Sequence, residues 1–432
     1  MSDGTPLDDP RPMLWHHARD AASAADSATL DRATGCLTVA IADMVVSARI
    51  NRHRAAAEAL AGVPGACTVS GLAGRTDISS AVLANAYLMH ARLTDDSFRV
   101  AAHPGLAVVP VALAALEHTA QHKAQPPDGD RLLRAVVGGY ECACLLAEQL
   151  LPDVSQRGWR VTSVIAPLAA AATMALMLDL PEDDACAALG LAAGAVGGPL
   201  GVVSAKGDGW SLQPALAVQA GVSATIAASA GLRSGAGTLA GPHGLYSLFG
   251  GASAGAEPRR SEQRAAIHRV TFKRFPVAMY GQSIFDALRA QPPINGTIRH
   301  VCVQIAPFAA RYGNQRDASE DSIASVEGIT VAALRAFHPG LSRGWGAGER
   351  GIEAVGDPAL PELRARVTIE LSDGRTFAMT GDGDTSGWHS ADFYSHCITL
   401  LGNLGGQLYE AAATLSHGGH VGQLLELWHA AR

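Results

Sequence analysis

Apolar side chains recur at helical spacing early in the chain, where Leu30, Leu37, Ile41 and Met44 fall on one face. Residues three or four apart share one side of a helix, so this period predicts an amphipathic helix. The same period continues through 80–92, 106–120, 131–150, 163–178, 183–196 and 214–231. We therefore expect residues up to about 260 to be all-helical, with many Ala and Gly residues that let the helices approach closely.

The pattern changes after residues 250–260, a stretch rich in Gly, Ala and Pro that marks a boundary. Residues 298–305 alternate between apolar and polar, which predicts a strand. Residues 367–371 and 376–379 flank Ser372-Asp373-Gly374 and predict a β-hairpin, while 323–337 is helical in pattern. The fold class is thus mostly α, with a large helical domain followed by a smaller α+β domain.

Composition narrows the class of protein. A chain of 432 residues is too long for one ordinary core, so at least two domains are expected. A net charge of −7 without a basic tract argues against nucleic acid as a partner. The apolar runs are interrupted before they reach membrane-spanning length, and the seven cysteines have neither disulfide nor zinc spacing. Residues 1–22 begin acidic and Pro-rich, which predicts a flexible tail and a cytoplasmic protein.

Polar residues concentrate between Asn85 and Gly105. Pro104 disfavours helical geometry at His103, so this imidazole is expected in a loop, where it is a candidate acid or base. The alternative is that Asp95 and Asp96 cap or solvate a helix end and His103 is a turn residue. His90 is interpreted as a packed core histidine, and His243 as a residue of a structural turn.

Further landmarks follow in order: Gly138-Gly139-Tyr140-Glu141, Gly158 to Thr162, the small-residue run 166–172, 189–198, 238–246 and Phe272 to Pro276. With this order of motifs the chain, from about Leu30 to its C-terminal helices, resembles the MmgE/PrpD family. That family includes 2-methylcitrate dehydratases, cis-aconitate decarboxylases and iminodisuccinate epimerases. The resemblance implies a helical domain at 23–260 and 390–432 and an α+β lid domain at 261–389, with the active site between them. It also implies a homodimer.

The resemblance carries over residue by residue only in part. The family's DFDDT and HPG motifs correspond to Leu93 to Ser97 and to His103-Pro104-Gly105, so one acid is replaced by Leu93. The family's histidine, lysine, later histidine and tyrosine fall on Arg160, Trp210, Ala278 and Gly328. The resemblance therefore implies a remodelled site with these catalytic candidates: His103, Asp96, Lys273 and Tyr280. The expected substrate-binding residues are Ser97, Arg160, Thr162, Arg99, Lys206 and Arg274.

Retained cations predict a small anionic substrate. Dehydration needs a base for the Cα proton and an acid for the leaving hydroxide, whereas phosphate can leave with cations alone. We therefore expect a metal-independent lyase without a cofactor that catalyses β-elimination of water or phosphate in a specialised pathway, with Arg160 and Lys273 gripping a polyanion opposite Asp96 and Ser97. Two alternatives remain: an isomerase, epimerase or decarboxylase acting on a small carboxylic acid, and a catalytically silent binding subunit.

Overall fold

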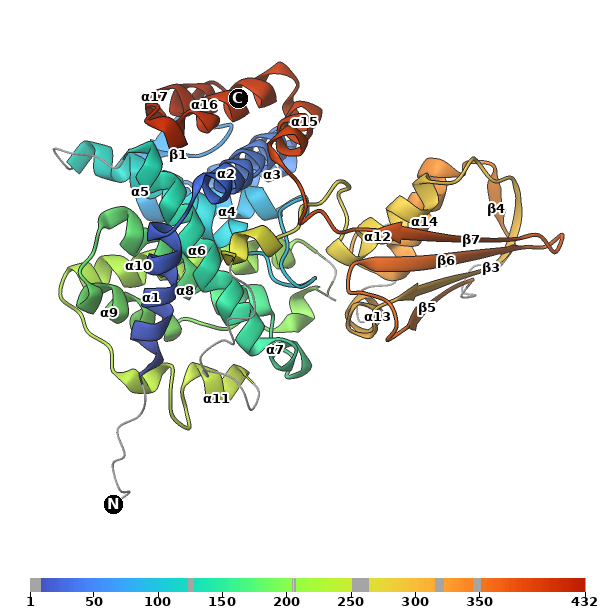
Figure 1. Ribbon diagram of the computed structural model, residues 1–432, viewed down its shortest axis with the longest axis horizontal. Helices are drawn as coiled ribbons and strands as arrows, with labels where there is room; N and C mark the ends of the chain where they lie inside the picture. Colours follow the sequence, from blue (N-terminus) through green and yellow to red (C-terminus); the bar gives the residue numbers. More distant parts are fainter. Residues whose placement is uncertain are drawn as a thin grey trace.

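A computed structural model describes residues 9–122, 128–203, 205, 207–250, 264–314, 322–344 and 351–431. Helices predominate, in agreement with the predicted mostly-α class. Figure 1 shows a helical body with a smaller sheet-containing lid at its side. The longer helices of the body are α1 (Pro10–Ser23), α2 (Ser27–Ala48), α3 (Asn51–Leu60), α4 (Ile78–His90), α5 (Gly105–His122), α6 (Gly129–Leu150), α8 (Val161–Leu178), α9 (Glu182–Ala193) and α10 (Gly209–Ser229). Shorter elements are α7 (Asp153–Gln156), η1 (Leu200–Val203), η2 (Ala236–Thr238) and α11 (Leu245–Phe249).

The N-terminal segment is not a loose tail beyond residue 9, because residues 10–23 form α1. Asp9 caps this helix by accepting a hydrogen bond from the Arg11 N–H, and Pro10 occupies its first turn. Leu14 and Trp15 are buried as α1 packs against α6 and α9. Residues 1–8 of the predicted tail lie outside the described residues.

Helix α8 lies at the centre of the body and contacts α5, α6, α9 and α10. By length and composition it is apolar enough to cross a membrane, but 89% of it is buried inside the body. A second candidate span would need α2 and α3 together, which are bent by 103°. Close packing depends on Gly221 of α10, where an added Cβ would come within 2.8 Å of the Ala170 Cβ of α8.

The expectation of an all-helical body is wrong at one place. Strands β1 (Pro64–Thr68) and β2 (Arg75–Thr76) pair antiparallel between α3 and α4. The pairing is short and irregular, with a register shift between Pro64 and Cys67, so it carries little periodic signal in the sequence.

The lid contains a mixed sheet of five strands among the described residues: β3 (Gly296–Ile305), β4 (Leu341–Arg343), β5 (Ile352–Gly356), β6 (Arg364–Leu371) and β7 (Thr376–Asp382). Strand β3 pairs parallel with β4 and β5 and antiparallel with β6, which forms the predicted hairpin with β7. The helices of the lid are α12 (Met279–Arg289), α13 (Pro307–Asn314) and α14 (Val326–Phe337). The alternating residues of β3 bury one face, as the pattern predicts.

Two segments connect the lid with the body. Residues 264–278 contain η3 (Ala266–Arg269), which packs on α2 and α6, and Thr271, which exchanges two backbone hydrogen bonds of 2.8 Å with Ser97. At the other end, α15 (Ser390–Leu401) and α16 (Asn403–Ala413) return to α2, followed by η4 (Leu415–His417) and α17 (Val421–Ala430) (Figure 1). Residues 266–273, which the resemblance places in the lid, therefore contact the body, whereas Arg274 to Ala278 contact the lid.

Candidate active site

A cavity of about 350 Å³ lies where the loop after α4 and the start of α10 meet the start of α12. His103, Arg160 and Tyr280 line it, so these predicted residues do come together. Leu93, Trp210 and Ala278, which stand where the family has polar residues, also line it. The remaining lining residues are Arg52, Ala91, Val100, Ala101, Val203, Ala205, Gly207, Asp208, Met279, Tyr312, Ser322, Ile323 and Ala324.

His103 lies in the loop directly before α5, as Pro104 predicted. Its Nδ1 lies 2.8 Å from the backbone oxygen of Asp96. A carbonyl oxygen only accepts hydrogen bonds, so Nδ1 carries the proton and Nε2 keeps its lone pair. The side chain is 7% exposed, and within the described part of the chain no hydrogen bond to Nε2 is present. The cavity is therefore lined by an imidazole whose basic nitrogen is available to a ligand.

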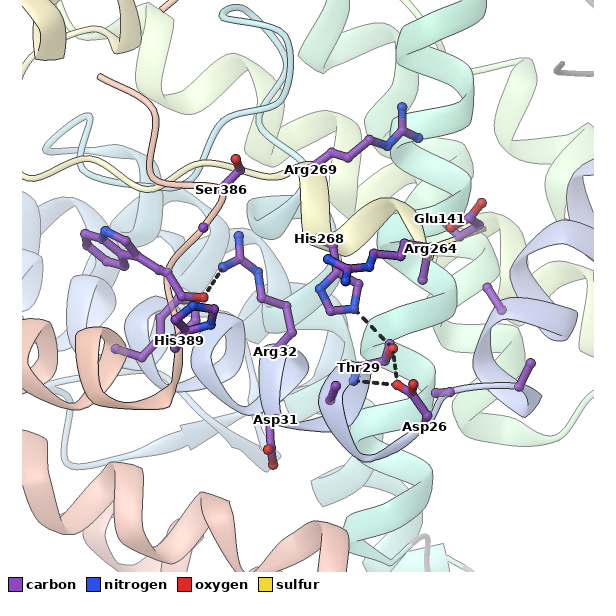
Figure 2. A pocket seen from close by; sticks show the side chains of 18 of the residues that line it. Asp26, Thr29, Asp31, Arg32, Glu141, Arg264, His268, Arg269, Ser386 and His389 are labelled. Atoms are coloured by element: carbon purple, nitrogen blue, oxygen red, sulfur yellow. Dashed lines mark hydrogen bonds between the residues drawn. The ribbon is translucent and has the colours of Figure 1, made fainter. Parts of the chain in front are cut away.

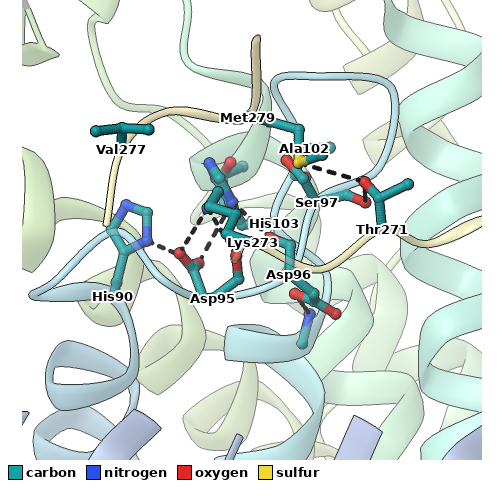
Figure 3. Close-up of polar contacts among 12 residues, drawn as sticks. His90, Asp95, Asp96, Ser97, Ala102, His103, Thr271, Lys273, Val277 and Met279 are labelled. Atoms are coloured by element: carbon teal, nitrogen blue, oxygen red, sulfur yellow. Dashed lines mark hydrogen bonds and ion pairs between the residues drawn. The ribbon is translucent and has the colours of Figure 1, made fainter. Parts of the chain in front are cut away.

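Asp95 is the centre of a buried polar cluster behind this imidazole, shown in Figure 3. Its Oδ2 lies 2.8 Å from His90 Nδ1 and 3.3 Å from His103 Nδ1. Its Oδ1 accepts a hydrogen bond of 3.0 Å from Lys273 Nζ, which also donates to the Asp95 backbone oxygen at 2.7 Å. Asp95 thus orients two histidines with one oxygen and a lysine with the other.

The electrostatics of the cluster follow from burial and from these partners. Burial alone would raise the pKa of Asp95, but the Lys273 ammonium and the hydrogen bond from His90 lower it below its usual range. Burial lowers the pKa of His103 well below 6.5, against the opposing effect of Asp95. Burial likewise lowers the pKa of His90. At neutral pH the cluster therefore holds an ionised Asp95, a charged Lys273 and two neutral imidazoles.

Asp96, which we predicted to be catalytic, is turned away from the cavity. Its Oδ2 accepts a 2.6 Å hydrogen bond from the Tyr140 hydroxyl, and its Oδ1 accepts one of 3.0 Å from the Gly105 N–H. A Cβ at residue 105 would meet both partners at 2.6–2.7 Å, so Gly is required there. Burial raises the pKa of Asp96 to about 7. Asp96 anchors the start of α5, and the carboxylate behind His103 is that of Asp95.

The loop reaches this arrangement through an unusual backbone. Leu93, Arg99 and Val100 all have positive φ, at 56°, 47° and 71°. Such values are uncommon for residues other than Gly and are strained for a β-branched residue such as Val100. Leu93 and Val100 both line the cavity, so the strain lies at the candidate site.

Other predicted binding residues are buried as structural groups. Lys273 is 1% exposed and paired with Asp95, so it supports the cluster from behind and does not line the cavity. The Ser97 hydroxyl donates to the backbone oxygen of Val100, and the Thr162 hydroxyl donates to that of Ala101. The expected polyanion grip by Arg160 and Lys273 opposite Asp96 and Ser97 is therefore not formed.

The remaining predicted cations lie elsewhere. Arg99 points outward and pairs with Glu362 at 3.3 Å, because its left-handed backbone reverses the loop. Arg274 donates to the backbone oxygen of Asp382 and pairs with Asp286 within the lid. Lys206 lies outside the described residues.

The hydroxyl of Tyr280, at the start of α12, donates to the backbone oxygen of Ala324, a neighbour in the cavity wall. Tyr280 is thus placed in the cavity while holding the lid segment 322–324. Gly328, the fourth replaced position, is buried in α14 and donates its N–H to the Ser325 hydroxyl, away from the lining.

Arg160 and His90 complete the wall. Arg160 is 3% exposed at the start of α8, where its NH2 group donates to His90 Nε2 at 2.6 Å and its NH1 group to the backbone oxygen of Trp210. The Trp210 ring packs edge-on against His90, with centroids 5.2 Å apart. His90 is buried, as predicted for a core residue, but its two nitrogens link Arg160 to Asp95.

One set of side chains has the spacing of metal ligands, since donor atoms of His90, Asp95 and His103 lie within 4.8 Å of one another. Both nitrogens of His90 already take part in hydrogen bonds, and Asp95 is paired with Lys273. A divalent cation there would also face Lys273 and Arg160 at close range. The donor set fits a hydrogen-bonded cluster and not a metal centre.

A larger cavity of about 840 Å³ lies between α1, α2, α6, η3 and the turn before α15. Figure 2 shows its charged lining, which includes Asp26, Arg32, Glu141 and His268. Arg32 donates to three backbone oxygens, those of Ile267, Val270 and Trp388. His268 Nε2 lies 3.1 Å from the Thr29 hydroxyl, and Glu141 accepts from the Ala266 N–H. These groups hold the surrounding segments together.

The residues that sequence reasoning missed are Asp95, as the partner of His103, and His90. A usable signal was the five-residue step from His90 to Asp95, which lets the last turn of α4 meet the loop that follows it. Arg52 of α3 and Asp208 were also missed; they pair at 3.7 Å, largely exposed, beside the cavity. They are far apart in sequence and belong to no motif.

The structure thus combines a helical body, an α+β lid and a cavity between them that is lined by His103. The family model described as the MmgE/PrpD N-terminal domain matches residues 15–256, more than half of the chain. The chain therefore belongs to the MmgE/PrpD family, as its motifs indicated. This membership is consistent with a function of the dehydratase or lyase type. No curated protein matches the chain.

Proposed function

We propose that the chain is a carbon–oxygen lyase that removes the proton from the carbon next to a carboxylate in a small anionic substrate and expels water or phosphate from the neighbouring carbon. One observation carries this proposal. His103 has its proton fixed on Nδ1 by Asp96 and Asp95, and its Nε2 lone pair is available at the cavity. A neutral imidazole held in this way is a general base.

Asp95 supports such a base in both states of the reaction. When His103 takes up a proton, the buried carboxylate next to it stabilises the imidazolium, because attraction between charges is stronger at a buried position than in water. Lys273 keeps Asp95 ionised but is fixed on the far oxygen. Proton transfer to His103 therefore does not require Asp95 to change its own protonation.

The rest of the cavity limits the substrate. Arg160 is the only buried cation among the described residues that line it, and its permanent positive charge favours a carboxylate in the cavity. The lining holds two phenols, those of Tyr280 and Tyr312, and the Tyr280 hydroxyl would have to leave the Ala324 oxygen to protonate leaving water. A phosphate leaving group needs no proton donor. A volume of about 350 Å³ suits a small acid.

We also propose a homodimer. Helix α10 contains no charged residue over its 21 positions, yet Leu216 and Ile226 are 48% and 45% exposed on its outer face. An uncharged, apolar helix face suits contact with a second subunit.

The cavity lining departs from the family's pattern at Leu93, Trp210 and Ala278. These departures support a specialised substrate over the substrates of central metabolism.

Deuterium exchange tests the proposed reaction. A panel of β-hydroxy and β-phosphoryloxy carboxylic acids is incubated with the protein in D₂O, and proton NMR follows both deuterium at the α carbon and release of the leaving group. Release of water or phosphate, with exchange at the same carbon, is the expected result. Exchange without release would favour an epimerase instead.

Two variants make the test specific. His103→Gln removes the base, while His243→Gln changes an exposed histidine outside the cavity. The proposal requires exchange and release to fall in the first variant and to persist in the second. Equal rates in His103→Gln and wild type would contradict it.

A further inference from the structure

His90 and Arg160 form a continuous hydrogen-bonded path from the cavity wall to the carboxylate behind His103. The path begins at Arg160 NH2, which lies 2.6 Å from His90 Nε2. It continues from His90 Nδ1 to Asp95 Oδ2 over 2.8 Å. The same Oδ2 lies 3.3 Å from His103 Nδ1. One carboxylate oxygen thus joins two imidazoles, of which only His103 lines the cavity.

The partners of His90 determine its tautomer. A guanidinium can only donate, so His90 Nε2 must present its lone pair to Arg160. The Asp95 carboxylate accepts, so the proton of His90 lies on Nδ1. Both nitrogens of this buried ring are therefore committed, and His90 has no lone pair left for a substrate.

The charges around His90 favour this neutral form. Lys273 lies on the other side of Asp95, Arg160 contacts the ring directly, and His103 packs against it with centroids 4.9 Å apart. Asp95 is the single carboxylate that contacts the ring among the described residues. A second proton on His90 would lie next to the guanidinium, in a fully buried site where charges are screened little.

A neutral His90 matters for His103 because both rings draw on Asp95. If His90 were protonated, Asp95 would be compensated by two cations, Lys273 and His90, and would support an imidazolium at His103 less well. If His90 were absent, Asp95 Oδ2 would lose its shorter contact and could turn. The orientation of the His103 ring therefore depends on whether His90 is neutral, protonated or absent.

We propose that His90 and Arg160 are positioning residues: Arg160 holds His90 neutral with its proton on Nδ1, and His90 holds the Asp95 carboxylate against His103. Arg160 thereby fixes the base of the site through His90, in addition to facing the substrate. This inference deepens the proposed function, because it assigns to His103 the state that a general base needs.

Nitrogen NMR of histidine-labelled protein tests the proposal without any substrate. Long-range proton–nitrogen spectra, recorded from about pH 5 to about pH 8, report the tautomer and protonation of each ring. We expect His90 and His103 in the wild type to show a protonated Nδ1 and a bare Nε2 at neutral pH. A wild-type His90 with its proton on Nε2, or one that titrates like a free histidine, would overturn the proposal before any variant is made.

Three variants separate the links of the path. In Arg160→Met, His90 should become protonated at a pH about one unit higher, because a neighbouring cation and a fixed donor are lost. In His90→Phe, the Asp95 carboxylate loses the contact that holds it and can turn from His103, so the His103 nitrogen shifts should move and its titration should fall by a similar amount. In His90→Asn, the amide nitrogen replaces Nδ1 as a donor to Asp95, so the His103 spectrum should stay close to that of the wild type.

A matched control is His53→Phe, which removes another buried imidazole, 4% exposed on α3, that packs on Tyr87 and makes no contact with Asp95. Its His103 signals should be unchanged. Unchanged His90 signals in folded Arg160→Met, together with unchanged His103 signals in folded His90→Phe, would refute the positioning roles. A failure of deuterium exchange with the expected spectra intact would instead count against the proposed lyase reaction.

Discussion

The two cavities differ in what their charged side chains do, and the larger cavity is not the candidate active site. The larger one, at about 840 Å³, is lined by many charged side chains, while the smaller one, at about 350 Å³, is lined mainly by apolar groups. In the larger cavity the charges are used for structure: Arg32 donates to three backbone oxygens and Arg269 pairs with Glu148. In the smaller one, a buried cluster ends in a single basic nitrogen, that of His103.

The comparison shows that charged residues at a cavity do not by themselves make a site. Catalysis needs a group whose protonation state is set by buried partners and whose reactive atom stays free. His268 of the larger cavity is bonded to Thr29 through Nε2, whereas His103 is held through Nδ1 alone. Variants in each region test this difference, with expected effects that decrease from the histidines to Arg99.

The largest difference should appear when each histidine is replaced. His103→Gln should reduce the rate of α-proton removal by about 10²–10⁴-fold, the usual contribution of a general base. His268→Gln, in the larger cavity, should leave the rate within about twofold of wild type. Initial rates with an acid accepted in the deuterium experiment provide the measurement.

The pH dependence sharpens this first prediction. A base must be neutral to act, so the rate should rise with pH through the pKa of His103 and then level off. Because burial holds that pKa well below 6.5, the plateau should already be reached at neutral pH. A rate that still climbs steeply above neutrality would show that His103 is not the group that titrates.

The second prediction concerns buried and half-exposed cations. Lys273→Met should destabilise the fold by about 3–5 kcal/mol, because Asp95 is left in the core without its cation. Arg269→Met, next to the larger cavity, loses a partly exposed pair with Glu148 and should lower stability by only about 1 kcal/mol. Urea unfolding of both variants measures these losses. Equal losses of unfolding free energy would contradict the expected difference between the buried cation and the partly exposed one.

The third prediction uses Asp43 of α2, a fully buried carboxyl whose oxygens have no hydrogen-bond partner within the described part of the chain. Burial raises its pKa to about 7 from 3.8. The folded state then holds a proton that the unfolded state releases, so stability is lost as pH rises from about 4 to about 7. Asp43→Asn should recover up to about 4 kcal/mol above that window and little below it.

Asp26, at the larger cavity, should have the opposite effect on the pH dependence of stability. Hydrogen bonds from Thr29 lower the pKa of Asp26, so its contribution is present above the unfolded pKa and is lost in acid. Melting temperatures recorded against pH for Asp43→Asn and Asp26→Ala should therefore diverge at neutral pH. If Asp43→Asn melted lower than wild type at every pH, the Asp43 carboxyl would stabilise the fold and would not carry the expected penalty at neutral pH.

The smallest effect is expected at Arg99, in the same loop as His103 but outside the cavity. Its pair with Glu362 is exposed, so Arg99→Ala should change stability by less than about 1 kcal/mol and the rate by less than about twofold. Arg160→Met provides the contrast, since it alters the cavity wall. A large loss of rate in Arg99→Ala would show that Arg99 does contribute to the site.

The helices of the body were predictable because their apolar period persists over many turns. The exception, α1, has both start signals, Asp9 as cap and Pro10 in the first turn, but its acidic neighbourhood suggested a tail. The short hairpin of β1 and β2 has no period long enough to detect.

The site was predictable only in part, because side-chain directions in a loop are not periodic. The sequence indicated His103 and the two neighbouring acids, but which acid faces the imidazole depends on the left-handed residues at 93, 99 and 100. The prediction that His90 is a buried core residue is correct, but only the fold shows that its ring nitrogens contact Arg160 and Asp95.

The burial of α8 has a consequence for how the protein is made. Until α5, α6, α9 and α10 cover it, this helix exposes an apolar stretch long enough to aggregate or to enter a bilayer. Arg160 is the N-cap of α8, so its place in the cavity wall and the enclosure of this helix depend on the same packing. A change that loosened α8 would therefore expose this apolar helix and disturb the cavity wall together.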